Sequence, residues 1–326
     1  MKLATLKNSK NPDGDLLVVS RDHRRAAKAT SIAPSLREAV ERWEVTEPAL
    51  RQIYNELNGG RAGFDLDQND LHSPLPRSFA WLDGSAYIQH VKLVRRARNA
   101  PLPEGLETDP LMYQGGSDSF LAPRQDIPLI DPDHGLDFEG EIAVITGNVP
   151  MGVKPEDAQA HVRLLMLVND VSLRGLIPPE LKKGFGFLNS KPSTAFSPFA
   201  LTPDELGGFW RAGRVHLPLK VTYNGSFYGI AEAGQMHFSF YELMAHAAKT
   251  RELRAGTILG SGTVSNEDTS KGSSCLAEKR MLEKIETGAF ITPFMKENDV
   301  IRIEMQDPDG NDLFGVIEQK VVRVNL

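Results

Sequence analysis

The hydrophobic positions of this chain fall mostly in short runs that alternate with polar residues or end at turn-forming residues. Such runs predict β-strands. Near the start, MKLATL and DLLVVS flank the turn sequence NPDG at residues 11–14, which predicts a strand pair. Two more hairpins are predicted, one around Asn224-Gly225 and one around residues 307–310, because strand-like runs flank both turns.

Helical spacing is confined to a few segments. Apolar residues over 35–57 predict two short helices with a break near residues 45–46. A third helix is expected to begin at Pro155 and to run through PEDAQAHVRL, because proline is favoured at the first helical position. A fourth is expected after Ser239, which forms a capping box with Glu242 ahead of LMAHAAKT.

Many strands and few helices indicate an α+β fold with a dominant mixed or antiparallel sheet. Residues 66–80 are rich in Asp, Asn and Pro, which is typical of a linker. We therefore predict a small β-rich N-terminal domain over residues 1–75 and a larger domain over residues 76–326.

Composition narrows the classes of function. Of the 326 residues, 25% are charged and 40% are hydrophobic, which is ordinary for a globular protein. The net charge of -6 argues against nucleic-acid binding, which requires a basic face. No apolar run approaches the ~20 residues of a membrane helix, and the first residues lack the apolar core of a secretory signal. The single cysteine, Cys275, fits a reducing cytoplasm and is expected to be a packed, inert thiol.

The stretch DFEGEIAVI carries two glutamates on one face of a predicted strand, because side chains at i and i+2 point the same way. By themselves, Glu139 and Glu141 fit a salt-bridged edge strand. Asp170 lies within VRLLMLVNDVSLRG, where an unpaired carboxylate is costly, and either pairing with Arg174 or capping a turn would relieve it. The three carboxylates outnumber the cations nearby, so we favour a hard divalent cation such as Mg²⁺, Ca²⁺ or Mn²⁺.

Other ligand motifs are weak in this chain. Zinc is not expected, because there is no HExxH motif and no cysteine cluster. The stretch GSGTVS lacks the lysine of a phosphate loop, and DPDGND lacks the final glutamate of a calcium loop. His90 follows Asp83 by seven residues, and taken alone it is best interpreted as a structural histidine.

Five segments occur in an order that resembles the fumarylacetoacetate hydrolase family: DGSAYIQHVKL, DFEGEIAVI, VNDVSLRG, SKPSTAFSPFALTPDELG and GTILGSGTVSNED. They cover about residues 80–326. The resemblance implies that residues 76–326 form a catalytic domain, a mixed β-sandwich roll with few helices. It also implies a homodimer that acts on a small diketo acid.

The resemblance also assigns roles to residues of this chain. It implies one divalent cation, with Mg²⁺ favoured over Ca²⁺ or Mn²⁺, held by Asp83, Glu139, Glu141 and Asp170. It implies a catalytic group in which His90 activates water, Glu267 orients His90, and Lys191 lies near the leaving group. Substrate contacts are implied for Arg174 and Tyr113. Two expected substrate contacts are replaced by Ser85 and Ile177.

The activity implied is hydrolysis of a carbon–carbon bond in a 1,3-diketo acid, either fumarylacetoacetate in tyrosine degradation or a related acylpyruvate. One alternative uses the same metal site for decarboxylation, isomerisation or hydration of a 2-oxo acid. His90 favours hydrolysis, because decarboxylase and hydratase relatives generally lack a histidine at this spacing. A second alternative is a non-catalytic small-molecule binding protein, which the changes at Ser85 and Ile177 would fit.

Overall fold

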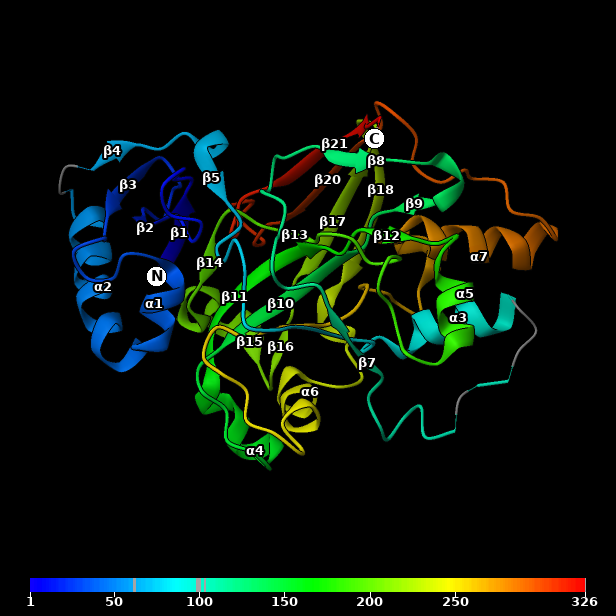
Figure 1. Cartoon of the computed structure of the whole chain (residues 1–326), viewed down its shortest axis with the longest axis horizontal. Coiled ribbons are helices and arrows are strands. Elements are labelled where there is room, and N and C mark those ends of the chain that lie inside the picture. The colour runs from blue at the N-terminus through cyan, green and yellow to red at the C-terminus, as the bar shows by residue number, and fades with distance from the viewer. Residues whose placement is uncertain (61–62, 98–100, 103, 326) are drawn as a thin grey trace.

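The structure is a computed structural model that describes residues 1–60, 63–97, 101–102 and 104–325. A smaller N-terminal part lies beside a larger part in which strands form the centre and helices the periphery (Figure 1). The predicted α+β class is confirmed. Among the described residues, none of the helices combines the length and the apolar composition that spanning a membrane requires.

The N-terminal part contains the predicted strand pair. Strands β1 (Lys2–Leu6) and β2 (Asp15–Val19) are antiparallel, and β3 (Arg25–Lys28) and β4 (Phe64–Asp65) extend the sheet. Gly14 in the connecting turn has a φ of 66°, and a Cβ atom there would lie 2.3 Å from Thr5 Cγ2. Only glycine fits this turn without a shift of the neighbouring strand.

Two helices cover this N-terminal sheet, α1 (Leu36–Glu41) and α2 (Trp43–Asn58). The Ser35 side chain caps α1 by accepting the amide N–H of Glu38. The predicted break near residues 45–46 is wrong, because the chain leaves helical geometry at Arg42. Thr46 stays helical, and its hydroxyl donates to the carbonyl oxygens of Ala39 and Arg42 across the junction.

The N-terminal strands continue into the central sheet of the larger part. From β1 onward the strand order is β14 (Ala200–Leu201), β11 (Val162–Asn169), β10 (Gly140–Thr146), β19 (Ile258–Gly260), β6 (Trp81–Gly84) and β7 (Met112–Gly115). Strand β5 (Leu71–His72) pairs with β1, and β13 (Ala195–Phe196) pairs with β11. Strands β6 and β19 are parallel, whereas the other pairs are antiparallel. Residues 66–80 therefore include a strand of this sheet, and the domain boundary near residue 75 remains a prediction.

A second sheet packs on one face of the central sheet. Its order is β18 (Ser226–Glu232), β17 (Pro218–Tyr223), β20 (Val300–Met305), β21 (Ile317–Arg323) and β8 (Ile127–Leu129). The two sheets share one hydrophobic core, in which Leu219 and Val221 lie against the start of β10. Both predicted hairpins are confirmed, and Asn224 and Gly225 adopt positive φ at the first turn.

The helices of the larger part are α3 (Ile88–Ala97), α4 (Pro155–Ala158), α5 (Ile177–Lys183), α6 (Phe240–Ala247) and α7 (Leu276–Thr287). Short strand pairs complete it, β9 (Leu136–Asp137) with β12 (Ser172–Leu173) and β15 (Trp210–Arg211) with β16 (Arg214–Val215). The capping box at Ser239 is confirmed. The helix from Pro155 is shorter than predicted, because a 3-10 turn (Gln159–His161) follows and VRL begins β11.

Candidate active site

The site residues gather at one end of the central sheet because of strand register. Gly140 at the start of β10 pairs with Asn169 at the end of β11, which brings Glu141 close to Asp170. Asp83 in β6 pairs with Gly260 in β19, the other neighbour of β10. Carboxylates that are far apart in sequence therefore lie together at the same end of three strands.

Three of the four predicted metal ligands form a compact buried cluster. Carboxylate oxygens of Asp83, Glu141 and Asp170 all lie within 4.8 Å of one another. Among the residues that the structure describes, neither oxygen of Glu141 has a hydrogen-bond partner, although the side chain is fully buried. Burial and the neighbouring carboxylates raise the pKa of both Asp83 and Glu141. The unpartnered oxygens of Glu141, close to carboxylate oxygens of Asp83 and Asp170, fit a hard divalent cation.

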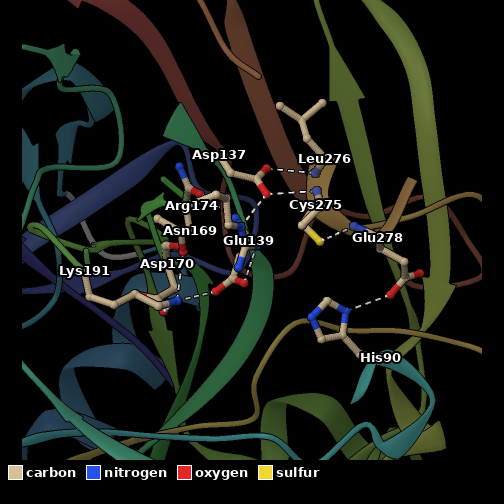
Figure 2. Close-up of polar contacts among 12 residues, drawn as sticks. His90, Asp137, Glu139, Asn169, Asp170, Arg174, Lys191, Cys275, Leu276 and Glu278 are labelled. Atoms are coloured by element: carbon tan, nitrogen blue, oxygen red, sulfur yellow. Dashed lines mark hydrogen bonds and ion pairs between the residues drawn. The ribbon is translucent and has the colours of Figure 1, made fainter. Parts of the chain in front are cut away.

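Glu139, the fourth predicted ligand, makes different contacts. Its two oxygens accept hydrogen bonds from Arg174 Nη2 and Lys191 Nζ, each at 2.6 Å (Figure 2). Burial raises the pKa of Glu139, but the two cations outweigh burial, so its pKa is lowered and the group is ionised. A ligand role for Glu139 remains a prediction, and in this structure the glutamate is ion-paired.

Asp170 joins the carboxylate cluster to several polar side chains. Its Oδ2 accepts hydrogen bonds from Lys191 Nζ at 2.6 Å and from the Tyr113 hydroxyl at 2.7 Å, and its Oδ1 accepts from Thr194. Burial alone would lower the pKa of Lys191, but Asp170 and Glu139 raise it above its usual value. Lys191 is therefore an ammonium in the site, and the phenol of Tyr113 contacts the same carboxylate.

Arg174 is committed to internal contacts. Its Nε donates to Asp137 at 2.8 Å and its Nη2 to Glu139, and the side chain is 16% exposed. The alternative in which Arg174 neutralises Asp170 does not match these contacts, since Lys191 takes that place. The substrate contact predicted for Arg174 remains a prediction.

His90 lies in the first turn of α3, and its carboxylate partner differs from the prediction. His90 Nδ1 lies 3.0 Å from Glu278 Oε2, and the Glu278 side chain is 3% exposed. Glu267 is exposed in the loop after β19, so its predicted role in orienting His90 is corrected to Glu278. Figure 2 shows the second ring nitrogen of His90 turned toward the side of Glu139, Asp170 and Lys191.

The prediction of Glu267 as the partner of His90 failed because of how the chain folds after β19. The loop after β19 continues past Glu267 and returns in α7, whose first turn carries Glu278 next to α3. The available signal was the local pattern SSCLAE, in which a helix start places a glutamate in the first turn. Cys275 precedes that turn, fully buried, and burial raises its thiol pKa, as expected for a packed cysteine.

Substitution of Glu278 and of Glu267 tests which of the two glutamates orients His90. Glu278→Gln is expected to lower kcat by about 10²-fold or more, because a neutral amide no longer stabilises the imidazolium that forms when His90 accepts a proton. The matched change Glu267→Gln removes an exposed charge and is expected to leave kcat within about twofold. Steady-state kinetics of both variants would reveal the opposite ranking if Glu267 were the partner.

Comparison with known proteins identifies the family. Residues 80–322 match the fumarylacetoacetate (FAA) hydrolase C-terminal model, and residues 1–77 match fumarylacetoacetase N-terminal domain 2. The chain therefore belongs to the fumarylacetoacetate hydrolase family of enzymes, which confirms the resemblance of its motifs.

Individual relatives carry several activities. The mitochondrial oxaloacetate tautomerase fahd2 of Xenopus laevis is 24% identical over 99% of this chain and 90% of its own length. Fumarylacetoacetase of Caenorhabditis elegans is 25% identical over 79% of this chain and 71% of its own length. The fold matches a maleylpyruvate hydrolase from Sphingobium sp. SYK-6, in complex with manganese(II) and pyruvate, with a TM-score of 0.66 and 17% identity over 100% of both chains.

Proposed function

We propose that this protein hydrolyses a carbon–carbon bond in a 1,3-diketo acid, either fumarylacetoacetate or a related acylpyruvate. The observation that carries the proposal is the pairing of His90 with Glu278, which leaves the other ring nitrogen turned toward the side of Glu139 and Asp170 (Figure 2). A carboxylate accepts a hydrogen bond from Nδ1–H, which leaves the lone pair of Nε2 free to accept a proton. A base of this kind is what activation of water requires.

A bound divalent cation would polarise a substrate carbonyl and stabilise developing negative charge. The residues that would hold it are Asp83, Glu141 and Asp170, with Glu139 as the predicted fourth ligand. Mg²⁺ as this cation, the homodimer and the cytoplasmic location remain predictions from the sequence.

The reaction needs one proton removed from water and one delivered to carbon. His90 takes the proton from water, and the resulting hydroxide oxygen bonds to the carbonyl carbon. The bond between that carbon and the central CH₂ then breaks, and its electron pair moves into an enolate. The Lys191 ammonium stabilises the enolate charge, and the enolate carbon takes up the proton that His90 removed from water, which restores neutral His90 and gives a carboxylic acid and a ketone.

A second candidate is tautomerisation of oxaloacetate, which the similarity to fahd2 along nearly the whole chain favours. This reaction moves a proton between carbon 3 and the oxygen on carbon 2, and it consumes no water. His90 and Lys191 could serve as its proton-accepting and proton-donating groups. The two candidates therefore differ in their products and not in the residues that they need.

Removing the metal tests the proposal. Protein treated with EDTA is expected to lose turnover of an acylpyruvate and to recover it with Mg²⁺ or Mn²⁺, because Lys191 pairs with Asp170 but the Glu141 oxygens have no partner among the described residues. An acylpyruvate, fumarylacetoacetate and oxaloacetate are each offered as substrate, and the products are identified by NMR. Turnover that is unchanged in EDTA would refute the metal mechanism. Enol–keto exchange of oxaloacetate without hydrolysis would select the second candidate, and metal binding without any turnover would indicate a binding protein.

A further inference from the structure

Asp137 is a buried carboxylate that the proposed chemistry does not use. Its side chain is fully buried in β9, two residues before Glu139. Oδ1 accepts the backbone N–H of Leu276 at 2.8 Å, and Oδ2 accepts the backbone N–H of Ala277 at 2.9 Å and Arg174 Nε at 2.8 Å. One side chain therefore connects the ion-paired side of the site to the start of α7 (Figure 2).

The contact with α7 fixes the end of the helix that carries Glu278. Leu276 and Ala277 are its first two residues, and amides at these positions have no acceptor within their own helix. The next amide, that of Glu278, donates to Cys275 Sγ at 3.3 Å, and a thiol is a weak acceptor. Asp137 is thus the strong acceptor at this terminus, and its negative charge suits the helix dipole.

We propose that Asp137 is a positioning residue for the His90 base. By anchoring the first turn of α7, it sets where Glu278 lies, and Glu278 sets the orientation of the His90 ring. Through Arg174, the same carboxylate holds Glu139, so it also sets the distance between the base and the carboxylate side of the site. The kinetic consequence rests on the proposed function, whereas the structural consequence needs no substrate.

The structural consequence is tested by NMR of ¹⁵N-histidine-labelled protein. The Nδ1–H signal of His90, assigned by its loss in His90→Ala, is expected to disappear or broaden in Asp137→Asn, because the amide cannot accept all three donors. Asp137→Ser serves as a second variant if the first folds poorly. The matched control is Asp13→Asn, since Asp13 is also a buried aspartate paired with arginines but lies in the N-terminal part. An unchanged His90 signal in a folded Asp137 variant would overturn the proposal.

The kinetic consequence is tested by a double-mutant cycle with Glu278. Asp137→Asn is expected to lower kcat for the diketo acid by about 10²-fold through misplacement of the base, with little change in KM. Because both residues act through His90, the variant carrying both Asp137→Asn and Glu278→Gln should stay within about twofold of Glu278→Gln alone. Losses that multiply would show that Asp137 acts independently of Glu278. If the unmodified protein turns over no substrate, the proposed function fails, and the histidine signal still decides the role of Asp137.

Discussion

Glu141→Gln is expected to weaken divalent-cation binding by at least about 100-fold and, at the same time, to stabilise the metal-free protein. The loss of binding follows from the position of Glu141 within the three-carboxylate cluster. The stabilisation follows from its two buried oxygens, which have no hydrogen-bond partner among the described residues. Without a bound cation, ionising Glu141 is costly because burial and the neighbouring carboxylates disfavour its charge, and a neutral side chain of the same shape removes that cost.

The stabilisation expected for Glu141→Gln in the metal-free protein depends on pH. The folded-state pKa of Glu141 is raised by burial and by Asp83 and Asp170, so folding favours the protonated carboxyl. The contribution of Glu141 to the stability of the metal-free protein is therefore fully present below the unfolded-state pKa of a glutamate and is lost as the pH rises through the folded-state pKa. The side chain of the Gln variant stays neutral at every pH and so avoids this loss, and at neutral pH its melting temperature without metal should be about 5 °C higher than that of the unmodified protein.

Calorimetric titration with Mn²⁺ and melting curves in EDTA between pH 5 and pH 8 measure both effects. The matched control is Glu304→Gln, because Glu304 is similarly buried but pairs with Lys220 and Arg302. Burial raises the pKa of Glu304, yet these cations lower it overall, so removing its charge should destabilise the protein and leave metal binding intact. A Glu141 variant that binds Mn²⁺ normally, or that melts lower in EDTA, would contradict the proposed site.

His90→Ala is expected to lower kcat for hydrolysis by about 10²–10⁴-fold while cation binding is unchanged. The ring is hydrogen-bonded to Glu278 and is not part of the cluster formed by Asp83, Glu141 and Asp170, so its removal takes away the proton acceptor and leaves the three carboxylates in place. Any decarboxylation of oxaloacetate should persist, because that reaction needs charge stabilisation at the enolate and no activated water.

The measurement is kcat for an acylpyruvate and for oxaloacetate, together with Mn²⁺ affinity for each variant. His161→Ala is the matched control, since His161 lies in the turn before β11 and outside the site. Hydrolysis that survives in His90→Ala would place the base elsewhere. If tautomerisation falls as steeply as hydrolysis, His90 is the proton acceptor for both candidate reactions, and the products alone distinguish them.

Sequence reasoning found those parts of the site that depend on local pattern and charge balance. Asp170 and Glu141 were recognisable because carboxylates within apolar strands need compensation, and strand register then brought Asp83 beside them. The partner of His90 depends on how α7 packs against α3, and the two residues are 188 positions apart. The pattern SSCLAE marks Glu278 at a helix start, but it does not indicate which helix lies beside it. Tertiary packing also decides why, among the described residues, Glu139 is ion-paired and Glu141 is not, because it places Arg174 next to Glu139.

The pairing of β1 with β14 has a consequence for experiments on fragments of this protein. Residues 1–75 supply a strand that covers β14, and Leu3, Leu16 and Val18 share one core with Trp81, Leu164 and Phe196. A fragment of residues 76–326 would present β14 as an open sheet edge beside exposed apolar side chains, which is a template for pairing with other chains. We expect such a fragment to aggregate, so catalytic measurements should use the full chain, and mutations in the N-terminal part should lower the yield of soluble protein before they alter turnover.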